Sequence, residues 1–444
     1  MMDPSLKRKL DIMLDEGKDN EWSYPDSEMR AKIAVVSGVA AVVANLGLLK
    51  KPRDIRAPNQ VRDRLSVKAK VLSMNPRHFK RQYRLERETF TTLLSDITPL
   101  LEKSDEGTMM GVRSSGSIID PLLMLAITLR MLAGGSYLDI AFGYHVAESS
   151  VYGIFHKTCM AIDMQLDNIH FPYSNEEKLR LLEQTFLKYC KGAFPGTVAA
   201  GDGIVFKTQK PSSADTDGDV RDFFNRKGFY AHALQAFVDG DGKFVHLSMK
   251  VCASTHDGTA YVMTGASEKI KQWKLPEWAH VVLDEAYKCQ GQELSPWKGK
   301  NLPPEKDTFN YYLSLHRQCV ERAFGMLVGK WGIFWRPLRF SPQINGRIIT
   351  VCCKLHNLCL QNKEQPSNFY EISPRDINWQ RGDTCTPDST VLFTDGITVR
   401  SGSRTDLHKS TVRDRLTERL VMLGLSRPSH STFKKTVRRI RDKL

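Results

Sequence analysis

The hydrophobic pattern changes its period along the chain, and the change separates a helical region from a mixed one. Between about residues 88 and 164, apolar residues recur every three or four positions and would share one helix face, as do Phe90, Leu93, Leu94 and Ile97. Asp120 and Pro121 precede the apolar run 122–132 as an N-cap residue and a first-turn proline would. This region is therefore predicted to be all helical.

A glycine-containing stretch inside this region predicts a helix-turn-helix. A short helix from about Ser136, a turn at Gly143 and a second helix capped near Ser149 fit the sequence. The second helix of such a pair commonly lies in the DNA major groove, so Ser149 and Tyr152 are candidate DNA contacts. Helix pairs joined at a glycine also occur in bundles that bind nothing, so a packing role is the alternative.

After Pro172 the pattern shifts to short runs rich in β-branched and aromatic residues, which predict strands. The four clearest runs are 197–206, 230–238, 244–251 and 280–283. The second and third flank Asp239-Gly240-Asp241-Gly242, a sequence typical of a hairpin turn. A long helix is predicted from about Tyr312 to Lys330. The predicted fold class is α/β, with a mixed sheet that begins with an antiparallel hairpin and is flanked by helices.

The same pattern predicts four parts of the chain. They are a basic, largely disordered N-terminal arm with one apolar helix (1–78), a helical, helix-turn-helix-like domain (79–175), the sheet-containing domain (185–365), and a polar linker with a basic C-terminal tail (366–444). A further helix is predicted near 416–425. The uncharged segment 33–49 is short for a bilayer span and contains serine, glycine and asparagine, so a membrane span is not expected.

The charge balance favours a polyanionic partner. Lys and Arg total 64 against 50 Asp and Glu, a formal net charge of +14, and the basic stretch 434–443 could contact phosphate or serve as a nuclear import signal. Nine cysteines, an odd number without a CxxC pair, fit a reducing compartment. A zinc site at Cys352 and His356 is less favoured than a helix with buried thiols. A nucleic-acid-binding protein of the nucleus is the resulting expectation.

Three acidic residues carry the candidate chemistry. Asp202 lies within an apolar strand, Asp284 ends another strand, and Glu321 lies on the long helix one turn after Arg317. A carboxylate in mid-strand is costly to bury unless it is paired, for example with a divalent cation. Three carboxylates suit two Mg²⁺ or Mn²⁺ ions, the arrangement used for phosphodiester cleavage. The alternative is structural, because Arg317 and Glu321 have the spacing of an i,i+4 salt bridge.

Residues 198–357 resemble the DDE superfamily endonuclease domain of PIF/Harbinger-type transposases. Seven segments in the same order carry the resemblance: Gly201-Asp202-Gly203, Asn225-Arg226-Lys227-Gly228, Ser254-Thr255-His256-Asp257, Leu283-Asp284-Glu285-Ala286-Tyr287, Phe309-Asn310, Arg317 with Val320-Glu321-Arg322-Ala323-Phe324-Gly325, and Leu355-His356-Asn357. The helical region 79–162 also looks like the part that precedes the nuclease in that family. Two departures stand out: Ile204-Val205 replaces a frequent Thr-His pair, and Leu283 replaces the usual glycine before the second acid.

The resemblance implies a ribonuclease-H-like fold and a nuclease or transposase that cleaves DNA and transfers strands. Asp202, Asp284 and Glu321 would be both the catalytic residues and the ligands of two Mg²⁺ or Mn²⁺ ions, with Asp257 a rival for the second position. The remaining site residues would be phosphate contacts or auxiliary groups: Arg226 and Lys227 for DNA, and His256, Asp257 and Arg317 beside the metals.

Partners follow from the same resemblance. Relatives commonly work with a separate Myb-like DNA-binding protein, and a homo-oligomer is a further expectation. A domesticated protein that keeps the fold and binds DNA without cutting it is the second hypothesis.

Overall fold

The N-terminal part of the described structure is helical, as the pattern predicts. The computed structural model describes residues 63–103, 119–190, 192–216, 219–225, 227–249, 253, 255, 270, 275–364 and 410–428. Its first helices are α3 (Arg64–Ser73), α4 (Pro76–Tyr83), α5 (Arg87–Lys103), α6 (Pro121–Leu132), α7 (Tyr137–Gly143), α8 (Glu148–Gln165) and α9 (Glu176–Leu187). The apolar segment 33–49 and the basic tail 434–443 lie outside the described residues.

Capping residues fix where these helices begin. The Asp120 side chain accepts a hydrogen bond from the backbone N–H of Leu123 at 2.9 Å, and Pro121 occupies the first turn of α6 as predicted. Almost every residue of α6 is buried, which makes it the central helix of this region. The sequence pattern did not reveal α3. Pro76 begins α4, which Asn75 caps.

The predicted helix-turn-helix is present as the pair α7 and α8. The second helix begins at Glu148 after Ala147, which makes no side-chain capping bond, and not near Ser149; His145 supplies the left-handed turn conformation at φ +52°. Ser149 therefore lies in the first turn of α8, where it is exposed. Tyr152 is 42% exposed and contacts the rings of Tyr137 and Phe340. Whether this helix pair contacts DNA stays a prediction.

Six strands form the sheet in the described part of the chain. They are β1 (Thr197–Lys207), β2 (Phe224–Asn225), β3 (Phe229–Val238), β4 (Phe244–Ser248), β5 (His280–Val282) and β6 (Glu293–Leu294). The central order is β3-β1-β5-β6, with β2 and β4 paired to different stretches of β3. The pairs β1–β3 and β3–β4 are antiparallel, whereas β1–β5 and β5–β6 are parallel. The four strand predictions and the mixed, ribonuclease-H-like α/β fold are confirmed.

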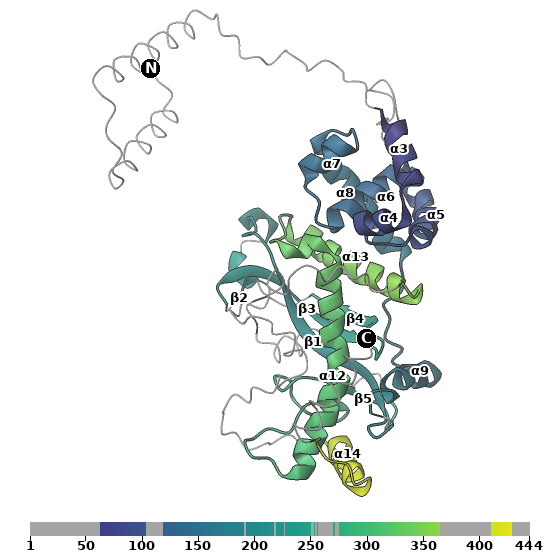
Figure 1. Cartoon of the computed structure of the whole chain (residues 1–444). Helices are drawn as coiled ribbons and strands as arrows, with labels where there is room; N and C mark the ends of the chain where they lie inside the picture. The colour runs from purple at the N-terminus through teal and green to yellow at the C-terminus, as the bar shows by residue number, and fades with distance from the viewer. Residues whose placement is uncertain are drawn as a thin grey trace, which may run out of the picture. The chain divides into compact units, whose positions relative to one another are not determined.

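Three helices complete the described structure. α12 (Pro304–Lys330) lies along the sheet against β1 and β3, and α13 (Pro342–Gln361) packs against β4 and α8 (Figure 1). α12 begins eight residues before the predicted start because Pro303 and Pro304 can open a helix. α14 (Thr411–Met422) packs against α12, with the buried Arg413 guanidinium 3.6 Å from the centre of the Trp297 ring. The packing of the sheet domain thus continues past residue 365.

Buried amide side chains join these layers. Asn357 on α13 accepts from the backbone N–H of Phe244 at 2.8 Å and donates to its carbonyl at 2.7 Å, which fixes the helix to β4. Asn310 on α12 binds the backbone of Trp297 in the same two-sided way. Within the described residues, no helix has both the length and the apolar content needed to cross a bilayer.

Candidate metal and DNA site

Strand pairing places two of the three predicted acids side by side. Asp202 lies near the middle of β1, opposite Ala236 of β3. On the other side of β1, Ala200 pairs with Val282 of the parallel strand β5. Asp284 follows β5 at the same offset from Val282 as Asp202 has from Ala200. The register therefore brings both carboxylates to one point on the sheet.

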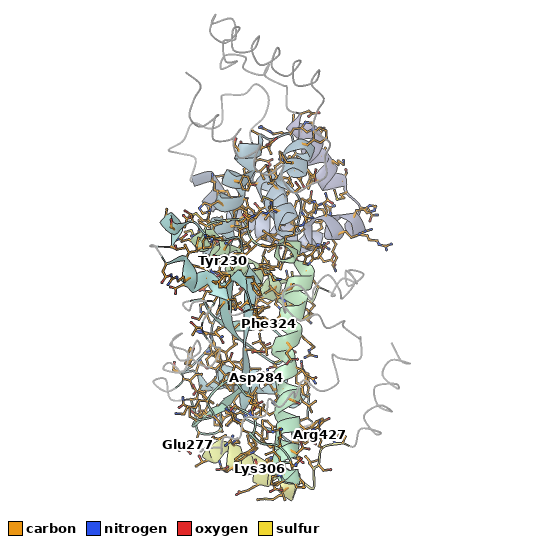
Figure 2. All side chains as sticks on the ribbon, turned by 90° about the vertical axis from the view of Figure 1, so that its left-hand side faces the viewer. Tyr230, Glu277, Asp284, Lys306, Phe324 and Arg427 are labelled. Carbon is orange, nitrogen blue, oxygen red and sulfur yellow. The ribbon has the colours of Figure 1, made fainter. Side chains whose placement is uncertain are left out.

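The third acid reaches the same point from α12, and Arg317 joins all three. Its Nη1 atom lies 2.9 Å from Asp284 Oδ1, and its Nη2 atom lies 3.3 Å from Asp202 Oδ2 and 3.7 Å from Glu321 Oε1. Figure 2 shows Asp284 beside α12. The two carboxylate oxygens that share Nη2 can be no more than about 7 Å apart, a separation that two ions about 4 Å apart can span. We call Asp202, Asp284 and Glu321 the triad.

Burial and mutual repulsion set the electrostatics of the triad. Burial is the largest of the effects that together raise the pKa of Asp202 to about 6; Asp284 and Glu321 add to the rise, while Arg317 and the backbone N–H of Gly203 oppose it. Burial would lower the pKa of Arg317, but the three carboxylates together raise it. The side-chain exposure increases from 24% at Asp202 to 43% at Asp284 and 50% at Glu321. The triad is thus a negatively charged site that opens to solvent.

Leu283, which stands where relatives usually have glycine, packs against Gly201, the residue before Asp202. A Cβ atom at Gly201 would lie 2.7 Å from Leu283 Cδ2 and 2.7 Å from Phe237 Cε1, closer than carbon atoms can pack. The fully buried Leu283 side chain therefore fills the space that the absence of a side chain at Gly201 leaves. The substitution of glycine by leucine changes the packing behind the triad but removes no carboxylate.

The structure adds a positioning pair that the sequence analysis missed. The Tyr287 hydroxyl donates to Gln235 Oε1 at 2.8 Å, and both side chains are buried. Gln235 lies opposite Gly203, and the Tyr287 backbone N–H donates to the Asp284 carbonyl at 3.1 Å. The loop that carries Asp284 is thereby fastened to the strand next to β1. A glutamine within the apolar strand 231–238 was the available signal.

The other predicted site residues are not joined to the triad by the described contacts. Lys227 is exposed, and its backbone N–H donates to Asn225 Oδ1 at 2.9 Å. Ser149 and Tyr152 lie on α8, as described above. Arg226, His256 and Asp257 lie outside the described residues. Of the two candidates for the second acid, Asp284 lies beside the other two acids, and the position of Asp257 is not described.

The zinc alternative finds no support in the described part of the chain. Cys352 is fully buried in the core, and His356 Nε2 lies 2.9 Å from the Gly242 carbonyl oxygen. No three His, Cys, Asp or Glu side chains among the described residues stand close enough to hold a metal ion as they are. In the triad the carboxylates face the Arg317 guanidinium.

The comparison with known protein families identifies the sheet domain. The sequence pattern of the DDE superfamily endonuclease family matches residues 201–357, a range that contains the whole triad and Arg317. This part of the chain is therefore similar to a DDE superfamily endonuclease domain. DDE nucleases generally use divalent metal ions, and the hard oxygen donors of the triad fit Mg²⁺ or Mn²⁺.

The curated relatives that match the chain are distant. The chain is 24% identical over 335 residues to Protein ALP1-like of Arabidopsis thaliana, covering 70% of this chain and 77% of the relative. It is 24% identical over 201 residues to Putative nuclease HARBI1 of Rattus norvegicus and 22% identical over 197 residues to that of Bos taurus. Each of these two matches covers 44% of this chain and about half (54%) of the relative. No solved structure matches significantly.

Proposed function

We propose that this protein is a metal-dependent nuclease that cleaves DNA phosphodiester bonds and can transfer the resulting strand. The observation that carries the proposal is the meeting of Asp202, Asp284 and Glu321, from a strand, the loop after another strand and a helix, around the Arg317 guanidinium. The closest pair along the chain, Asp284 and Glu321, is separated by 36 intervening residues, so their convergence depends on the tertiary fold. Their position within a DDE endonuclease domain supports the same chemistry.

The triad residues have distinct roles in this proposal. When bound, two Mg²⁺ or Mn²⁺ ions would activate the attacking hydroxyl and stabilise the leaving oxygen. Asp202 would hold both ions because it is the most buried of the three and belongs to a strand paired on both sides. Asp284 and Glu321, which are more exposed, would each hold one ion and leave the remaining positions open to a phosphate.

The substrate we propose is DNA, bound in the nucleus. The net charge of +14 supports a polyanionic partner, and Lys227 is an exposed cation in the segment that follows β2. The α7–α8 pair would add contacts through Ser149 and Tyr152. A Myb-like DNA-binding protein and a second copy of the chain are further proposed partners, and both follow from the family resemblance alone.

One observation favours a second function, that of a DNA-binding protein that does not cut. Arg317 pairs with all three acids, and such a pairing would also stabilise a domain that had lost its metal chemistry. In that case the triad would be a structural ion-pair cluster. The two functions differ in whether divalent ions bind and whether the DNA backbone is broken.

Cleavage of supercoiled plasmid DNA in the presence of Mn²⁺ tests the proposal. The wild-type protein should nick the plasmid, and D202N, D284N and E321Q should each lose this activity while still retarding DNA in a gel. D241N is the matched control, because Asp241 is an exposed carboxylate of the β3–β4 turn that pairs with Lys188. DNA binding without nicking by the wild-type protein would support the second function instead.

A further inference from the structure

Arg317 supplies one positive charge that all three triad carboxylates share. Its guanidinium is within ion-pair distance of every triad carboxylate, and its side chain is only 13% exposed. Glu321 is its i+4 neighbour on α12, whereas Asp202 and Asp284 come from the sheet. One side chain thus neutralises part of the charge of three acids contributed by separate elements.

The contacts of Arg317 differ from those of an ordinary structural arginine. A guanidinium bound to one carboxylate usually makes two parallel N–H···O bonds, but here its two terminal nitrogens are divided among three carboxylates at 2.9 to 3.7 Å. Arg317 Nε is buried and has no hydrogen-bond partner among the described residues. Arg317 Nη2 donates a long hydrogen bond to Asp202 Oδ2 at 3.3 Å, and the contacts with Asp284 and Glu321 are ion pairs. Charge therefore contributes much of what holds the guanidinium, so another cation can replace it.

Two positive groups cannot share this site without strong repulsion. A guanidinium and a divalent ion a few ångströms apart in a partly buried site repel each other, and both depend on the same carboxylate oxygens. Either the guanidinium withdraws when metal binds, or the metal binds weakly. In both cases Arg317 lowers the affinity of the triad for divalent ions.

We infer that Arg317 is a built-in counter-cation that holds the triad together in the metal-free protein and competes with divalent ions for it. This inference rests on the proposed function, because it takes the triad to be a metal site. It makes Arg317 a positioning residue: the guanidinium keeps three mutually repelling carboxylates in place until metal replaces it.

Titration of the full-length protein with Mn²⁺ alone, followed by calorimetry, tests the inference. We compare the wild-type protein with R317Q, which keeps side-chain bulk without charge, and with R317K, which keeps a charge that can contact fewer carboxylates at once. R322Q is the matched control, because Arg322 lies on the same helix but contacts Tyr189 and not the triad. R317Q should bind Mn²⁺ at least tenfold more tightly than wild type, R317K should fall between them, and R322Q should match wild type.

Thermal melting gives a second readout that remains informative if R317Q folds poorly. Without metal, R317Q should melt at a lower temperature than wild type, and Mn²⁺ should restore its melting temperature because the ion supplies the missing positive charge. Equal or weaker Mn²⁺ binding by R317Q, or no rescue by Mn²⁺, would overturn the inference and leave the nuclease proposal standing if wild type binds. Absence of Mn²⁺ binding in both proteins would instead overturn the proposed function.

Discussion

The hydroxyl of Tyr287 and the side-chain oxygen of Gln235 are 2.8 Å apart, and this hydrogen bond fastens the loop after β5 to β3. Tyr287 follows Asp284 by three residues, and Gln235 faces Gly203, the residue after Asp202. The bond therefore spans the strand that carries the first acid and fixes the loop that carries the second. A polar pair in this position stabilises the geometry of the triad from behind.

Tyr287→Phe should destabilise the protein by about 1–3 kcal/mol, because it leaves the buried Gln235 oxygen without its donor. Urea unfolding measures the change in the free energy of unfolding. The double variant Y287F/Q235L removes both polar partners and should be less destabilised than the sum of the two single variants. Additive effects of the two substitutions would show that the hydrogen bond contributes little.

Gly201→Ala should destabilise the protein by about 1–3 kcal/mol, because the new methyl group would overlap Leu283 and Phe237. Leu283→Ala in the same chain should recover part of the loss, since it removes one of the two overlapping side chains. Gly325→Ala is the control: that glycine lies on α12, and a methyl group added there would meet no atom within 4 Å, so the change should be neutral or stabilising. Similar melting temperatures for G201A and G325A would contradict the packing described behind Asp202.

Stability should fall below neutral pH because of buried neutral histidines such as His356. Burial is the largest of the effects that together lower the pKa of His356 to about 4; Lys330 adds to the decrease, and the hydrogen bond to Gly242 opposes it. An unfolded histidine binds a proton near pH 6.5, so the stabilising contribution is complete above pH 6.5 and is lost as the pH falls toward 4.

For each such histidine, the free energy of unfolding should fall by about 2 kcal/mol as the pH falls from 7.5 to 5. Urea unfolding across this range measures the change. His356→Gln should reduce the slope of the free energy of unfolding against pH by the equivalent of about one proton taken up on unfolding. His170→Gln, which changes an exposed histidine, is the control. A free energy of unfolding that does not change between pH 7.5 and pH 5 would be inconsistent with buried neutral histidines.

Lys227→Gln should weaken DNA binding to a similar extent on every sequence, because a lysine–phosphate contact carries no base information. The slope of log affinity against log salt should become shallower by about 0.9 for one lost contact. Fluorescence anisotropy with a labelled duplex between low and moderate salt measures both quantities. Lys178→Gln, an exposed change on α9 outside the DDE domain, is the control; an equal loss in both variants would argue against a specific role for Lys227.

The elements that carry the triad could be predicted from the sequence because their signals are local. The runs 197–206 and 280–283 have the β-branched, apolar character of buried strands, and an acid within or after such a run is conspicuous. The helix that carries Glu321 was also predicted, although its first two turns were missed because they are polar and begin with prolines.

The tertiary contacts of Arg317 could not be predicted in the same way. Its i,i+4 relation to Glu321 is visible in the sequence, but its contact with Asp202 joins residues 115 positions apart. The bond between Tyr287 and Gln235 and the packing of Leu283 on Gly201 also depend on the strand order β3-β1-β5. Such contacts follow from the topology of the sheet, which no local pattern encodes.

The number of Mn²⁺ ions bound by the wild-type protein and by D202N is the measurement that tests the central claim most directly. If Asp202, Asp284 and Glu321 together hold a pair of divalent ions, calorimetry should show two ions bound per wild-type chain and none bound with comparable affinity by D202N. Identical Mn²⁺ binding by the two proteins, each folded by circular dichroism, would contradict the account.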